Sequence, residues 1–79
     1  MVSIIDMRSR NRQLTAVVEK AYAAASPEVR EEVDRIVASP GASAYDENNA
    51  LEAIYANLRA RVNALIAGGA EHALFADYL

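Results

Sequence analysis

Three arginines at alternate positions near the start of the chain, Arg8, Arg10 and Arg12, are the residues best suited to bind a ligand. Guanidinium groups bind phosphates, and a basic arm gains affinity for nucleic acid by releasing counterions. In a helix, however, Arg8 and Arg12 share a face while Arg10 points away from it. Because the chain as a whole carries a net charge of −3, we do not expect nucleic acid as its main partner. A small dimeric DNA-binding regulator that uses this basic arm is the alternative function.

Acid–base, metal and covalent chemistry each lack the groups they need. His72 is the one histidine and the chain has no cysteine, whereas a zinc site requires three or four convergent ligands. Ser26, Ser39 and Ser43 stand where helix caps and turns account for them, and the glycines do not form a phosphate-binding pattern. We therefore predict that the chain is not an enzyme, with no catalytic residue, metal site, cofactor or small-molecule substrate.

The clearest boundary between elements is Ser26-Pro27. A serine that can cap a helix precedes a proline, which fits the first helical position because its missing N–H would be unpaired there. The sequence predicts a helix over 27–38, with an apolar stripe along one side. We expect the helix to end at the Ser-Pro-Gly sequence of residues 39–41, because proline cannot continue the helical hydrogen bonds.

A longer helix is predicted over 44–67. Ser43 and Asp46 have the spacing of a capping box, apolar residues then recur with the helical period, and Gly68-Gly69 ends the helix. Residues 70–79 are expected to form a short helical segment after the two glycines. The long helix also carries a line of small side chains that lets another backbone approach closely: Ala53, Ala60, Ala64 and Ala67.

The first helix is predicted over 4–25, from residues that recur at spacings of three and four as in a coiled-coil seam. Asn11 is the polar member of this seam. Either it fixes the register or the oligomeric state of paired helices, or it is a solvated residue on a frayed first turn. Since residues 8–13 contain no apolar side chain, a second possibility is a separate N-terminal arm, with the helix beginning near residue 9 or 11.

The length of 79 residues favours a single domain, 1–79, with a small core. Without a disulfide or a metal to strengthen that core, oligomerisation is the expected supplement. No basic-then-apolar leader stands at the N-terminus, and no apolar run approaches the roughly 18 residues that span a bilayer. We therefore expect a cytoplasmic protein with no membrane partner, and the excess of arginine over lysine favours a bacterial or phage source.

Helix lengths predict where apolar surface remains. At 1.5 Å per residue, the first and third helices are about 33–36 Å long and the second is about 18 Å long. If the third helix turns straight back along the second, its part from Val62 onward extends past the hairpin formed by the first two helices and exposes an apolar patch. A two-fold homodimer, intertwined or side by side, would bury it. The candidate interface residues are Leu58, Val62, Leu65, Ile66, Leu74, Phe75, Tyr78 and Leu79.

The expected fold class is thus all-α: a long–short–long arrangement of three helices plus a short C-terminal segment. Because four large apolar side chains crowd into the last six residues, segment 70–79 is expected to be a detachable recognition or dimer-locking element outside the central bundle. The predicted function is a protein–protein interaction module that binds itself and another protein, as a regulator, inhibitor or adaptor acting through an apolar helix face. A structural subunit of a larger assembly is a further alternative.

Overall fold

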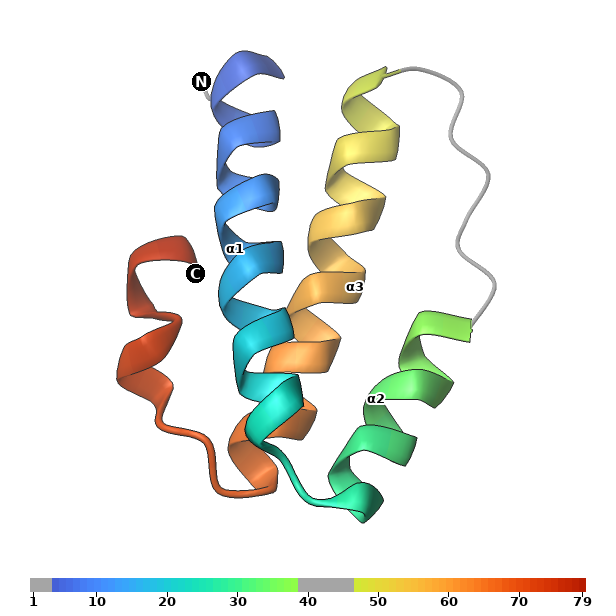
Figure 1. Ribbon diagram of the computed structural model, residues 1–79. Coiled ribbons are helices and arrows are strands. Elements are labelled where there is room, and N and C mark those ends of the chain that lie inside the picture. The colour runs from blue at the N-terminus through green and yellow to red at the C-terminus, as the bar shows by residue number, and fades with distance from the viewer. Residues whose placement is uncertain (1–3, 39–46) are drawn as a thin grey trace.

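The computed structural model of the chain describes residues 4–38 and 47–79 (Figure 1). This part contains three α-helices, α1 (Ile4–Ala24), α2 (Pro27–Ala38) and α3 (Glu47–Ala67), and two short 3₁₀ turns, η1 (His72–Leu74) and η2 (Ala76–Tyr78). The predicted all-α class is confirmed. The expected stop at 39–41, the capping box and the first residues of the helix predicted from residue 44 lie outside the described residues.

Helix α1 runs without a break through residues 8–13, the stretch in which the sequence allowed two possibilities. In this stretch the buried position that an apolar residue would normally occupy is taken by the Asn11 side chain, while Arg8 and Arg12 face solvent. The hydroxyl of Thr15 donates a hydrogen bond to the carbonyl of Asn11 at 2.7 Å. The N-terminal arm that the sequence left open is therefore part of the helix from Ile4 onward.

Helix α3 is the central element of the molecule. It lies beside α1, which runs parallel to it, on one side and beside the antiparallel α2 on the other, while α2 packs more closely on α3 than on α1 (Figure 1). The chain end returns along the opposite side of α1, and the Cα atoms extend over 36 × 26 × 15 Å. Seven buried apolar side chains form the core: Leu14, Val18, Val33, Leu58, Val62, Leu65 and Phe75.

Helix α2 begins with the predicted cap, since the amide of Val29 donates to the hydroxyl of Ser26 at 3.4 Å. Two contacts fix its position along α3. The side-chain amide of Asn57 donates to the carbonyl of Ile36 at 3.0 Å. Near the other end, Gly68 lies so close to Val29 that an added Cβ would overlap the valine side chain. Helix α2 therefore runs antiparallel to α3 along its second half.

The expectation that α3 overshoots from Val62 onward is wrong, because that half is the one covered by α2 and the chain end. The part that extends past α2 is the first half. Helix α3 begins at Glu47, ten residues before the level of Asn57, and ten helical residues span about 15 Å. The sequence-based prediction chose the wrong half of α3 because α3 does not start level with the end of α2.

Residues 70–79, which we call the C-terminal strap, fold back over α1 and α3 instead of continuing away from them. The reversal follows Gly69, which has a φ of +113°, and the amide of Ala70 donates to the carbonyl of Leu65 at 2.9 Å. The strap consists of η1 and η2, and Phe75 between them is 0% exposed. The expectation that this segment lies outside the central bundle is therefore wrong.

Candidate interaction surface

The eight residues predicted as an interface occupy two different environments. Leu58, Val62, Leu65 and Phe75 are at most 1% exposed and belong to the core. Ile66 and Tyr78 are half-buried against that core, whereas Leu74 and Leu79 are 51% and 45% exposed. The structure thus brings the set together around the strap, but within one chain it leaves only Leu74 and Leu79 largely exposed.

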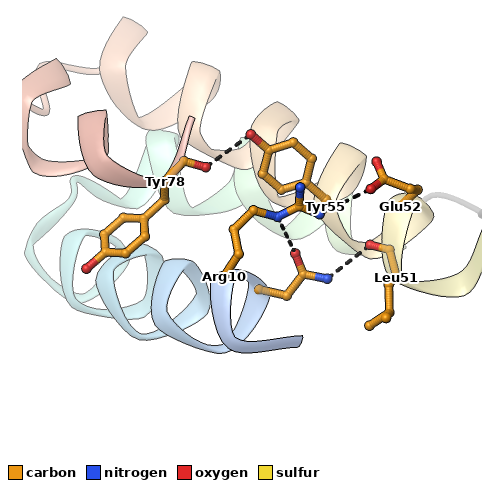
Figure 2. Close-up of polar contacts among 6 residues, drawn as sticks. Arg10, Leu51, Glu52, Tyr55 and Tyr78 are labelled. Atoms are coloured by element: carbon orange, nitrogen blue, oxygen red, sulfur yellow. Dashed lines mark hydrogen bonds and ion pairs between the residues drawn. The ribbon is translucent and has the colours of Figure 1, made fainter. Parts of the chain in front are cut away.

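Arg10, the middle member of the predicted basic arm, lies between α1 and α3. Its guanidinium stacks on the ring of Tyr55, 3.6 Å from the centroid, and Nη2 lies 3.5 Å from a carboxylate oxygen of Glu52 (Figure 2). A cation placed over an aromatic face at this distance is stabilising by about 0.5–2 kcal/mol. Arg10 is therefore engaged in holding the two helices together, while Arg8 and Arg12 are exposed on α1.

Asn11 is 6% exposed and forms a hydrogen bond to α3. Its side-chain amide donates to the carbonyl of Leu51 at 3.0 Å, and its side-chain oxygen accepts from Nε of Arg10 at 3.3 Å (Figure 2). A buried polar group that lost such partners would cost about 1–3 kcal/mol. Asn11 thus sets the register of paired helices, as one of its two predicted roles required, and the paired helix is α3 of the same chain.

The same cluster also contacts the strap. The hydroxyl of Tyr55 donates to the backbone carbonyl of Tyr78 at 3.0 Å (Figure 2). Tyr55 therefore connects Arg10 of α1, its own helix and the last turn of the chain. This arrangement is a structural junction of three elements. It could not be recognised from the sequence, because its members lie up to 68 positions apart.

A second polar cluster lines a small hollow of about 160 Å³ among the three helices. There the hydroxyl of Tyr22 donates to a carboxylate oxygen of Asp34 at 2.9 Å, and this hydrogen bond raises the pKa of Tyr22. Nε of Arg61 donates to the side-chain oxygen of Asn57 at 2.7 Å. Burial lowers the pKa of Arg61, against the opposing effect of Glu19. The Tyr22–Asp34 pair connects α1 and α2, whereas the Arg61–Asn57 pair lies within α3.

A shallow, open groove of about 590 Å³ lies between α2 and α3. We call its α3 side, where small residues predominate, the floor and its α2 side the wall; the floor consists of Ala60, Asn63, Ala64 and Ala67 of α3 and of Gly68, which follows that helix. The three alanines belong to the line of small side chains noted in the sequence. The sequence could not reveal the groove itself, because its wall depends on where α2 lies along α3.

The α2 side of this groove combines apolar and acidic groups. Val29 and Ile36 line it, together with Glu28 and Glu32 at its margin. Glu32 forms an ion pair with Arg35 on the exposed face of α2. We call this concavity, with its apolar floor and acidic margin, the α2–α3 groove.

The remaining groups that could take part in acid–base or metal chemistry are the histidine and the carboxylates. His72 is exposed in η1, and across residues 4–38 and 47–79 no three histidine, aspartate or glutamate side chains gather to hold a metal ion. None of the described helices is long and apolar enough to cross a membrane. Comparison of the chain with family models, with curated proteins and with solved structures finds no match.

Proposed function

We propose that this chain is a non-enzymatic protein–protein interaction module, a regulator, inhibitor or adaptor whose α2–α3 groove receives a helix of another protein. The observation that supports this proposal is the groove itself. Its floor of small side chains lets a second helix axis approach to the 8–10 Å typical of packed helices. Burial of each large apolar side chain in such a groove is worth about 1.5–3 kcal/mol.

The acidic margin adds a preference for one kind of helix. Glu28 and Glu32 line the groove, and Glu32 already pairs with Arg35 of α2, so a basic residue beside the apolar stripe of a partner helix would meet opposite charge chiefly at Glu28. Rim charges of this kind contribute more to selectivity and association rate than to affinity. The expected ligand is therefore a helix with a narrow apolar stripe and basic flanks.

Self-association is a second part of the proposal, and it is supported by the small size of the core. In the described residues that core consists of seven buried apolar side chains. Because the chain has no cysteine, no disulfide can strengthen so small a core, and oligomerisation is the expected supplement. Sedimentation equilibrium at tens of micromolar should give the mass of a homodimer, and a monomer mass would contradict this part.

DNA binding through Arg8, Arg10 and Arg12 has less support. Arg10 is bound to Tyr55 and Glu52 within the chain, so a phosphate would have to displace these contacts. The surface of α2 also carries carboxylates, which repel phosphates: Glu28, Glu31, Glu32 and Asp34. Retention on a nucleic-acid column that falls steeply with salt would support this alternative over the groove.

The groove is tested by filling it. Ala60→Trp places a large ring on its floor, and Ala16→Trp, at an exposed position of α1, is the matched control. Tagged wild-type and variant chains are compared for the host proteins they retain, after circular dichroism shows equal helix content. We expect A60W to lose a protein that wild type and A16W both retain. If A60W and A16W retain the same proteins, the groove is not the binding site.

A further inference from the structure

We infer that two copies of the chain exchange their C-terminal straps, so that residues 70–79 of each copy occupy the site on the other copy that holds the strap within one chain. This inference rests on the proposed self-association and names the element that produces it. It makes no use of the α2–α3 groove, so the two proposals can fail separately.

The first support is the site in which the strap lies. Phe75 is 0% exposed within a core that includes Leu14 of α1 and Leu58 of α3, and Tyr55 donates to the carbonyl of Tyr78. These contacts join the strap to the helical bundle, and a strap from an identical chain would reproduce each of them. Exchange of an identical element is therefore a low-cost route to a dimer.

The second support is the connection between α3 and the strap. The reversal depends on Gly69, whose φ of +113° is one that other residues rarely adopt, and an added Cβ there would meet no atom within 4 Å. Rotation at this residue directs the strap away from its own chain without breaking any core contact within the three helices. The four residues from Gly68 to Glu71 then span about 13 Å when extended, which exceeds the 8–10 Å between packed helices.

The third support is the space left around the strap. Leu74 is 51% exposed and borders a hollow of about 280 Å³ next to the two glycines, between the end of α1 and the end of α3. Ala21 and Ala24 line this hollow, and together with Leu74 they also line a second one of about 270 Å³. In the exchanged dimer the second copy lies at this end of the molecule, where it covers Leu74 and fills the hollows.

Cross-linking between singly labelled chains tests the exchange directly. The chain has no cysteine, so A21C and L74C each provide one thiol, and both positions line the same hollow. The two variants are unfolded together, refolded at high concentration, and treated with a short bismaleimide. We expect a covalent A21C–L74C dimer, and much less product when A16C replaces A21C. A dimer by mass that gives no A21C–L74C product, or no more than the A16C control, would overturn the inference.

The hinge provides an independent test. Gly69→Ala strains the reversed form, in which φ is positive, but not an extended connection, so the dimerisation constant should rise by about tenfold per hinge. Insertion of two glycines after Gly69 relaxes the reversed form and should lower the dimer fraction. If G69A is folded and its dimer fraction equals that of wild type, the hinge plays no part and the exchange is refuted. If G69A does not fold, the cross-linking result decides, and A60W should leave that result unchanged.

Discussion

Replacement of Phe75 by alanine is the most direct test of the way this small fold is completed. The side chain is fully buried, although it belongs to a ten-residue strap with only two short turns of its own. Truncation removes the whole ring from the core shared by α1, α2 and α3. The strap would then be held mainly by the hydrogen bond from Tyr55 to Tyr78.

The magnitude follows from complete burial. Phenylalanine-to-alanine changes in cores cost about 3–5 kcal/mol, and we expect the lower end because the strap can detach and let the cavity fill with water. A domain of this length has a free energy of unfolding of about 4–12 kcal/mol. The F75A variant should therefore remain helical at low temperature with little stability left.

Urea unfolding followed by circular dichroism at 222 nm measures the loss. With a slope of about 1 kcal/mol per molar urea for a small chain, a loss of 3 kcal/mol lowers the midpoint by about 3 M. Leu74→Ala, at a half-exposed position of the same strap, is the control and should cost less than about 1 kcal/mol. If F75A and L74A have the same midpoint, the strap is not part of the core and the reasoning about Phe75 is refuted.

Three further changes test individual contacts. Tyr55→Phe removes the hydrogen bond to the strap but keeps the ring, so the free energy of unfolding should fall by about 1 kcal/mol; an unchanged urea midpoint would contradict this. Gly68→Ala should cost about 1–3 kcal/mol by forcing a Cβ against Val29, and the cost should largely disappear when Val29 is also alanine. Asp34→Asn should lower the raised pKa of Tyr22 toward its ordinary value in an ultraviolet titration. Because the raised pKa favours the neutral phenol in the folded state, its contribution to stability is present below the ordinary tyrosine pKa and lost as pH rises through the raised one.

Local signals in the sequence predicted the helical elements well. The Ser26-Pro27 pair marks the start of α2 because its cap depends on neighbouring residues alone, and the cap is present. Gly68 and Gly69 mark the end of α3 for a similar local reason, since Gly69 has the positive φ that glycine adopts at little cost. Such signals fix where a helix begins and ends but not which parts of two helices meet.

The interface residues were harder to predict because their exposure depends on contacts between distant parts of the chain. Leu65 is apolar and helical under any arrangement, and it is buried because both α2 and the strap return to the second half of α3. The α2–α3 groove has the same origin: the alanines of its floor were visible in the sequence, but its wall required the contact between Asn57 and Ile36. Asn11 could be recognised as unusual, but its partner, forty positions away, could not.

The central place of α3 has a consequence for how the protein emerges from the ribosome. Helices α1 and α2 are made first, and each packs more closely on α3 than on the other. Isolated helices of 12–21 residues are marginal in water, so the first half of the chain has little to stabilise it until α3 has been synthesised. Even then the core lacks Phe75, which belongs to the strap that follows α3. Folding of this protein is therefore expected to be completed only once both α3 and the strap have emerged from the exit tunnel.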